Sequence, residues 1–172
     1  MSERSNSFFR YLAYVLELIL TFILCTTPGL MPEIFGAKPA LLVCVALTVA
    51  VFEREIPAMI IGLVAGVLTD LGYTDSIGVF AISLMIICFI VGYAANNLIV
   101  AKFFNYLLYA FVAIGLLFMV YFLVIFVIPG TDHMWDYFVA HIVSRMVQTF
   151  IYSIPFYFIN HFIYSTLSPE AG

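Results

Sequence analysis

Four ionisable side chains stand inside long apolar stretches of the sequence: Glu17, Asp70, His141 and Arg145. A charged side chain at the centre of a bilayer costs about 2.5–3.5 kcal/mol even on the lenient insertion scale, so such residues face other helices or a polar cavity. At about 1.5 Å per helical residue, Glu17 lies about 13 Å from the start of its apolar segment and Arg145 about 15 Å from the start of its own. Because both lie near mid-membrane, we predict a Glu17–Arg145 pair. It would be either an ion pair that fixes helix register or part of a proton or ion path.

The last apolar segment carries a stripe of polar side chains at His141, Ser144, Arg145, Gln148, Thr149 and Tyr152, among which His141, Arg145, Gln148 and Tyr152 recur every three or four residues. This spacing places them on one face of a helix. Polar faces in membranes turn toward other helices. The stripe therefore predicts either packing within this chain, or a face that receives a partner helix or lines a polar cavity.

Small residues and a carboxylate share one part of the sequence. Gly62, Gly66 and Asp70 follow one another at four-residue spacing on one helix face, Gly78 follows a run of turn-forming residues, and Gly92 lies in the next apolar segment. Small residues one turn apart let a second helix backbone come into contact. Asp70 is placed to hold the following turn or cap a neighbouring helix, and Gly78 permits a backbone angle that other residues resist. We expect these residues to make helix contacts, and the hairpin that they span to be the packing centre of the fold.

Catalytic, metal and nucleic-acid chemistry find little support in the sequence. It has no P-loop, dinucleotide fingerprint, nucleophile elbow or HExxH stretch. Cys25, Cys44 and Cys88 lie in apolar segments without a CxxC pair, which is typical of small buried hydrophobic residues. The segment 132–136 holds three potential metal ligands but is typical of a solvated acidic loop. We therefore expect no enzymatic activity, no cofactor, no metal and, without a basic patch, no nucleic acid.

The composition indicates a polytopic membrane protein. Of 172 residues, 65% are hydrophobic and 9% are charged, whereas soluble domains are about half apolar and a quarter charged. Spanning helices need about 20 apolar residues, fewer in a thin bilayer. We predict an all-α integral membrane protein, a single domain over 1–172, with six transmembrane helices at about 8–27, 39–52, 57–71, 77–95, 102–128 and 135–164. The second and third are short, which indicates a helix shielded by protein or a locally thinned bilayer.

Basic residues in the loops predict the orientation. With a cytoplasmic N-terminus, the cytoplasmic side holds Arg4, Arg10, Arg54 and Lys102, and the outer side holds only Lys38. This asymmetry agrees with the excess of Lys and Arg on the cytoplasmic side of membrane proteins. An even number of helices then places both termini in the cytoplasm.

The order of these features resembles a known family. Pro39 opens the short second helix, Gly62–Asp70 reads GLVAGVLTD after a charged turn, Gly78 begins the next helix and Gly92 lies near its end. This pattern is similar to that of the rod shape-determining protein MreD family of bacteria. The specific motifs cover about 39–97, while the length and hydropathy profile agree over nearly the whole chain.

The resemblance implies a non-enzymatic scaffold of the bacterial cell-elongation machinery in the inner membrane, which helps to maintain cell shape and lateral peptidoglycan synthesis. It implies binding to an MreC-like membrane protein and, indirectly, to MreB, RodA and a class B penicillin-binding transpeptidase. It also implies a fold similar to the membrane substrate-binding subunits of energy-coupling-factor transporters. That similarity supplies an alternative function, a vitamin-binding subunit, although segment 11–17, YLAYVLE, lacks the Ala-x-x-x-Ala pair that many such subunits carry on helix one. A channel or ion-coupled carrier is a third possibility, and it would need a water-filled route along the polar stripe.

Overall fold

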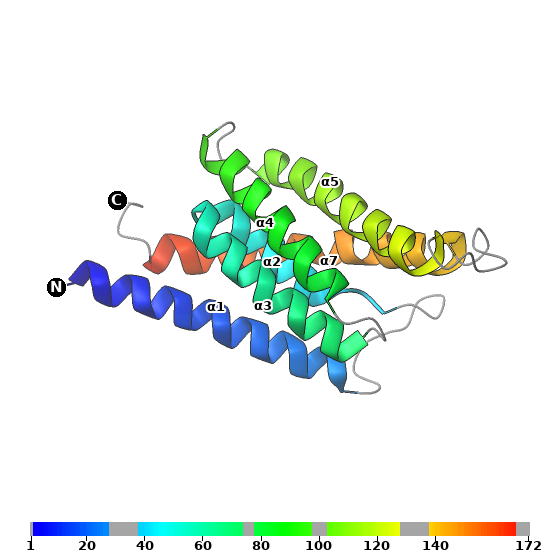
Figure 1. Ribbon diagram of the computed structural model, residues 1–172. Helices are drawn as coiled ribbons and strands as arrows, with labels where there is room; N and C mark the ends of the chain where they lie inside the picture. The colour runs from blue at the N-terminus through cyan, green and yellow to red at the C-terminus, as the bar shows by residue number, and fades with distance from the viewer. Residues whose placement is uncertain (1, 28–37, 74–77, 98–102, 128–137, 168–172) are drawn as a thin grey trace.

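The structure is a computed structural model that describes residues 2–27, 38–73, 78–97, 103–127 and 138–167. Over these residues the regular structure is entirely helical, as predicted. In chain order the elements are α1 (Ser2–Thr26), α2 (Leu41–Phe52), α3 (Glu55–Tyr73), α4 (Val79–Asn97), α5 (Phe103–Phe122), the π-helical turn η1 (Leu123–Val127), the π-helical turn η2 (Phe138–Val143) and α7 (Ser144–Leu167). Because η1 continues α5 and η2 leads into α7, the described chain forms six helical rods (Figure 1).

The lengths of these helices modify the prediction of six spans. Among the described residues, five helices are long and apolar enough to cross a membrane, and α2, at 12 residues, is shorter. The third helix is not short, because α3 has 19 residues and begins at Glu55. The segment 39–52 was predicted as a span because its apolar residues and its flanking turns match those of a membrane helix, although its length does not reach across the bilayer.

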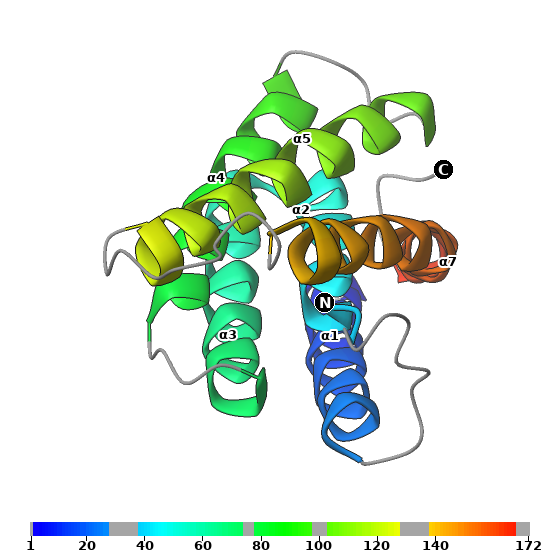
Figure 2. The ribbon, with the colours of Figure 1, turned by 90° about the vertical axis from the view of Figure 1, so that its right-hand side faces the viewer.

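The centre of the bundle is α2. Each residue from Leu41 to Val51 is at most 3% exposed, and α2 contacts α1, α3, α4, α5 and α7. Figure 2 shows α2 surrounded by these helices. A helix that is hydrophobic on all sides is stable only when it is buried on all sides. The prediction that the α3–α4 hairpin is the packing centre is therefore wrong. The neighbouring helices shield the short helix α2, and such shielding was one of the two expected explanations for its length.

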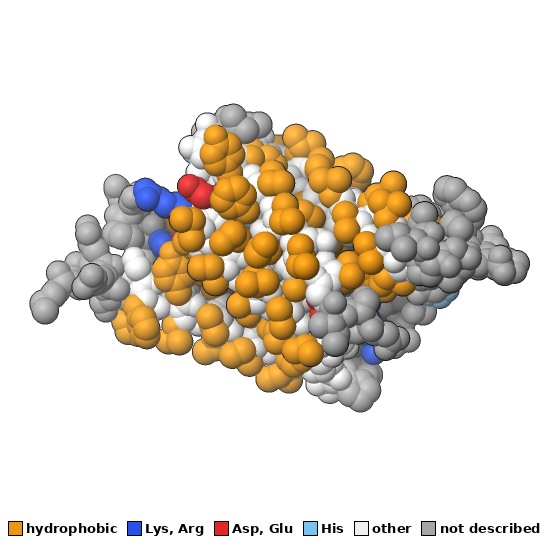
Figure 3. Space-filling model, viewed as in Figure 1, with side chains coloured by type: hydrophobic (Ala, Val, Ile, Leu, Met, Phe, Trp, Pro, Cys, Tyr) orange, Lys and Arg blue, Asp and Glu red, His pale blue; other side chains and the backbone are white. Residues whose placement is uncertain are grey.

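The outer surface of the bundle is apolar. Figure 3 shows one face covered by hydrophobic side chains, with the few charged groups on it lying toward its ends. Large aliphatic and aromatic side chains are exposed along α1, α3, α4, α5 and α7; Phe111, for example, is 66% exposed and Ile90 is 56% exposed. A surface of this kind is stable in the hydrocarbon of a bilayer and would drive aggregation in water.

The helices alternate in direction and define two ends of the bundle. At the first, here called the terminal end, α1 begins, α2 turns into α3, and α7 ends (Figure 1). At the opposite end α1 finishes, α2 begins and α3 approaches α4. Side chains near the two ends therefore come from helices far apart in the sequence.

Candidate functional site

Gly62 and Gly66 allow α3 and α4 to make backbone contact. A Cβ atom added at Gly66 would lie 2.5 Å from the Cα of Ala81 and 2.6 Å from the carbonyl oxygen of Phe80. One added at Gly62 would lie 2.8 Å from the Cβ of Cys88. These distances are shorter than carbon and oxygen contacts allow, so neither site has room for a side chain. This is the role expected from the small-residue spacing.

Two further glycines belong to α4 or its start: Gly92 allows a close contact between helices, and Gly78 allows a backbone turn. A Cβ atom added at Gly92 would lie 3.1 Å from the Cα of Glu55 and 3.3 Å from the carbonyl oxygen of Ala50, so α4 also passes close to α2 and the start of α3. Gly78, just before α4, has φ +101°. That backbone conformation is open to glycine and strained for residues with a side chain.

Asp70 of α3 caps the N-terminus of α4. Its Oδ2 accepts hydrogen bonds from the backbone N–H groups of Gly78 and Ala81, both at 3.0 Å, and its Oδ1 accepts one from Phe80 at 3.2 Å. The first N–H groups of a helix have no partner inside the helix, and the helix dipole favours a negative charge there. The side chain is 3% exposed. Asp70 therefore holds the turn and caps the neighbouring helix, the placement expected from its position.

The inner face of α7 is hydrogen-bonded to the helices around it. The Thr149 Oγ1 accepts a hydrogen bond from the Ala40 N–H at 3.1 Å, and the Cys44 thiol donates to the Thr149 carbonyl at 3.1 Å. The Tyr106 hydroxyl donates to the Ser153 carbonyl at 3.0 Å. Thr149 and Ser153 are fully buried. These contacts support packing within the chain as one role of the polar stripe; Ser153 was not predicted, although it follows Thr149 by one helical turn.

The remaining members of the stripe lie near the start of α7. Gln148 is 5% exposed, and its Nε2 donates a hydrogen bond to the Ser144 Oγ at 3.0 Å. His141 and Tyr152 are half-buried. The stripe is therefore divided between buried helix contacts and half-buried positions, and it does not form one continuous open face.

The structure does not bring Glu17 and Arg145 together. The Glu17 Oε1 accepts a hydrogen bond from the Asn160 Nδ2 at 3.1 Å, whereas the Arg145 Nε donates to the Lys38 carbonyl at 2.8 Å. Asn160 and Arg145 are separated by fifteen residues of α7, or about 22 Å along its axis. The predicted pair is therefore wrong, because Asn160, rather than Arg145, lies at the depth of Glu17.

A buried ion pair that was not predicted joins α1 to the α2–α3 turn. The Arg10 Nε lies 2.7 Å from the Glu53 Oε1, and the two side chains are 11% and 3% exposed. The Tyr11 hydroxyl donates to the Glu53 Oε2 at 3.2 Å, and the Asn96 Nδ2 donates to the Glu53 carbonyl at 2.8 Å. Burial raises the pKa of the Glu53 carboxyl above its ordinary value, and the Arg10 guanidinium opposes that rise. The orientation argument had already placed Arg10 and Arg54 at one end of the bundle, and Glu53 is the neighbour of Arg54 in the sequence, so that signal could have suggested the pair.

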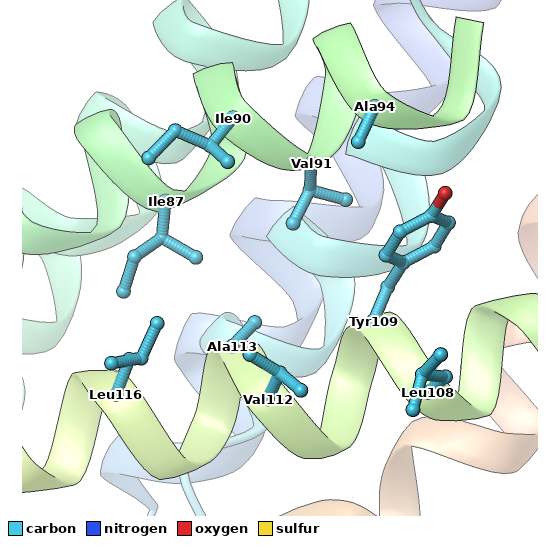
Figure 4. Close-up of a pocket in the computed structure, with 9 residues that line it drawn as sticks. All are labelled: Ile87, Ile90, Val91, Ala94, Leu108, Tyr109, Val112, Ala113 and Leu116. Atoms are coloured by element: carbon cyan, nitrogen blue, oxygen red, sulfur yellow. The ribbon is translucent and has the colours of Figure 1, made fainter. Parts of the chain in front are cut away.

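An apolar groove lies between α4 and α5 on the outside of the bundle. Its volume is about 310 Å³, and it is lined by aliphatic side chains and by Tyr109 (Figure 4). Ile90 and Ala94 form part of one wall, and Leu108, Val112 and Leu116 form part of the other. A groove of this kind suits hydrocarbon or the apolar side chains of a neighbouring helix.

Asp70, Thr149 and the Arg10–Glu53 pair are used for contacts between helices. Within the described ranges, no group of three or more His, Cys, Asp and Glu side chains is arranged to hold a metal ion. The segment 132–136 lies outside the residues that the structure describes. The helices are fixed against one another through glycine contacts, the Asp70 carboxylate cap and the buried Arg10–Glu53 ion pair.

Comparison with known proteins places the chain in a family. No curated protein and no solved structure matches it. A family model described as rod shape-determining protein MreD matches residues 5–166, nearly the whole chain. The multi-pass helical architecture described above agrees with a membrane protein. The chain belongs to the MreD family of rod shape-determining proteins.

Proposed function

We propose that this protein is a non-enzymatic scaffold of the rod cell-elongation machinery in the bacterial inner membrane. In this role it holds an MreC-like membrane protein in place, and through it acts with MreB, RodA and a class B penicillin-binding transpeptidase in lateral peptidoglycan synthesis. The family match carries the link to rod shape. The structural support is that Asp70, Arg10 and Glu53 are all engaged in contacts between helices rather than in an open polar site.

The proposed orientation has both termini in the cytoplasm. Arg4, Arg10 and Arg54 lie toward the terminal end of the bundle, while Lys38, before α2, and Arg145, which donates to the Lys38 carbonyl, lie toward the opposite end. An excess of basic residues on the cytoplasmic side is the general rule for membrane proteins. The terminal end is then the side that faces the filament, and the opposite end faces the wall.

The α4–α5 groove is the proposed seat of the partner's single transmembrane helix. The inner part of the α7 stripe, which was predicted as a possible partner face, is used inside the chain, and so are the glycine faces. The groove is instead a recess on the exposed apolar surface, with Leu108 59% exposed and Leu116 54% exposed at its wall. Helices in membranes associate by van der Waals packing, so protruding side chains of one helix in a recess of another supply the attraction.

The test is to fill the groove without disturbing the core. Ala94, which is half-buried and lines the groove, is changed in Ala94→Phe, and the matched control is Ala13→Phe at a half-buried alanine of α1. Figures 1 and 2 show α1 on the side of the bundle away from α5. We expect Ala94→Phe to lower the amount of MreC-like protein that co-purifies from native membranes several-fold, with an unchanged level of the MreD-family protein itself, and Ala13→Phe to leave it unchanged.

Cell shape provides the second measurement. In cells that lack their own copy of the gene, the wild-type protein and Ala13→Phe should restore rods, and Ala94→Phe should leave rounded cells. Equal co-purification with Ala94→Phe and wild type would reject the groove as the docking site. Failure of the wild-type protein to capture any MreC-like partner would reject the scaffold itself.

A further inference from the structure

Three polar side chains from three helices meet inside the bundle: Glu17 of α1, Thr48 of α2 and Asn160 of α7. Thr48 and Asn160 are fully buried. The Asn160 Nδ2 lies 3.0 Å from the Thr48 Oγ1 and 3.1 Å from the Glu17 Oε1, and donates hydrogen bonds to both. The cluster therefore ties the central helix to two of the helices that cover it.

Two oxygen atoms of this cluster are left without a donor. The Glu17 Oε2 and the Asn160 Oδ1 are both buried, and neither has a hydrogen-bond partner. An ionised carboxylate and an amide oxygen are both acceptors, so neither can satisfy the other. Buried polar atoms are nearly always hydrogen-bonded, because an unpaired one has lost its water without compensation.

One proton on Glu17 supplies the missing donor. A protonated carboxyl group is a donor through its O–H and an acceptor through its carbonyl. An acid and a primary amide that face each other then exchange two hydrogen bonds. The amide N–H donates to one carboxyl oxygen, and the acid O–H donates to the amide oxygen. The first of these bonds is the one between the Asn160 Nδ2 and the Glu17 Oε1, and the two unpaired oxygens are the atoms that the second would join.

The surroundings of Glu17 offer no positive charge near enough to stabilise an ionised carboxylate, among the residues that the structure describes. Within the part of the chain that the structure describes, the groups that face it are uncharged: Tyr14 on α1 itself, Thr48 on α2 and Asn160 on α7. Arg10 lies about two turns away on α1, about 10 Å along the axis, and forms its ion pair with Glu53. On α3, which also packs on α1, the ionisable groups stand near the two ends of the helix rather than beside the cluster. An isolated carboxylate in a medium of low dielectric constant is strongly disfavoured, and a neutral acid is not.

We propose that Glu17 is an intramembrane proton-binding site, in which the protonated carboxyl group pairs with the Asn160 amide at neutral pH. The bound proton allows Glu17 of α1 and Asn160 of α7 to exchange two hydrogen bonds, beside Thr48 of α2. Loss of that proton places a negative charge inside the bundle. It also leaves a carboxylate oxygen of Glu17 facing the amide oxygen of Asn160, and these two acceptors repel each other. The contact between α1 and α7 is thus sensitive to proton binding, which goes beyond the scaffold role proposed above and does not depend on it.

Infrared spectroscopy of the purified protein in lipid nanodiscs tests the protonation directly. We expect the carbonyl stretch of a protonated carboxylic acid at neutral pH, and its loss in Glu17→Gln. Glu55→Gln, which removes a half-buried carboxyl group at the start of α3, is the matched control and should keep the band. A spectrum of Glu17→Gln identical to that of the wild type would overturn the proposal.

Thermal unfolding across pH provides the independent readout. An unfolded glutamate releases its proton at about pH 4.3, whereas the folded protein holds the Glu17 proton at neutral pH. This group should therefore make stability fall as the pH rises above about 4.3, until the folded protein also releases the proton. Glutamine reproduces the neutral acid in the folded protein and releases no proton on unfolding, so Glu17→Gln should have a Tm at neutral pH at least as high as that of the wild type, and should lose the part of this decline that Glu17 causes. A Glu17→Gln protein that is clearly less stable at neutral pH, with the pH-dependent decline unchanged, would show that Glu17 is ionised in the fold.

Discussion

At the scale of single residues, each described acid near the bundle interior has a partner of a different kind. Asp70 accepts hydrogen bonds from backbone N–H groups of α4, Glu53 pairs with the Arg10 guanidinium, and Glu17 accepts a hydrogen bond from the Asn160 amide. Only one of these three partners is a charge. In a chain with 9% charged residues, polar partners for buried acids must come mainly from the backbone and from amides.

The Arg10–Glu53 pair provides a prediction at this scale. Removing one partner of a buried ion pair leaves an uncompensated charge and costs about 3–5 kcal/mol. We expect Arg10→Gln and Glu53→Gln each to destabilise the protein strongly, and the double variant to lose less than the sum of the two single losses. Thermal unfolding of the three variants in the same detergent measures this coupling. Strictly additive losses would mean that the pair does not contribute to stability.

At the scale of helices, the arrangement depends on where backbones touch. Gly62 and Gly66 bring α3 onto α4, and Gly92 brings α4 onto α2 and the start of α3. By contrast, a Cβ atom added at Gly115 of α5 would have the Met146 Cε as its nearest neighbour, at 4.0 Å. Glycine is therefore required at the α3–α4 contact and not at this position of α5.

Substituting alanine for Gly66 and, separately, for Gly115 tests whether glycine is required at one position and not at the other. Gly66→Ala places a methyl group 2.5 Å from the α4 backbone, and overpacking of this kind costs about 1–3 kcal/mol. Gly115→Ala finds ordinary space, and the helix propensity of alanine favours it by up to about 1 kcal/mol. We expect a lower Tm and less folded protein for Gly66→Ala, and an unchanged or higher Tm for Gly115→Ala. Equal Tm values for the two variants would contradict the contact.

At the scale of the whole molecule, a short helix forms the core and longer helices form the surface. α2 alone is too short to cross the hydrocarbon, at about 18 Å against about 30 Å. Its burial on all sides removes this problem, because its ends meet the polar groups of neighbouring helices rather than lipid. The Ala40 N–H just before α2 binds Thr149, and Glu53 just after it binds Arg10. The surrounding helices then present an apolar surface to the membrane.

Thiol labelling tests the orientation of this bundle. The native Cys25, Cys44 and Cys88 are all buried, so they can be left in place while a new cysteine is labelled. Arg54 and Thr26 are exposed at opposite ends of the bundle. We expect a membrane-impermeant thiol reagent to label Thr26→Cys in spheroplasts, and to label Arg54→Cys only after the membrane is opened. The reversed pattern would reverse the proposed orientation.

The sequence alone determined the class of fold, the positions of the helices to within a few residues for most of them, and the family. These follow from local properties, because a run of apolar residues must form a helix in lipid and a small-residue or turn pattern is read along the chain. The roles expected for Gly66 and Asp70 were also local, since both act on the next helix in sequence.

Only the tertiary structure decided which distant residues meet. In the structure the partner of Glu17 is Asn160 rather than the predicted Arg145, and Arg10 pairs with Glu53. The helix at the centre is α2 rather than the α3–α4 hairpin. The physical reason is that hydropathy sets how deep a residue lies, with an error of several residues, while the partner depends on the rotation and offset of two packed helices. One helical turn of offset, about 5.4 Å, is enough to change a hydrogen-bond partner, and Asn160 and Arg145 are about four turns apart on α7.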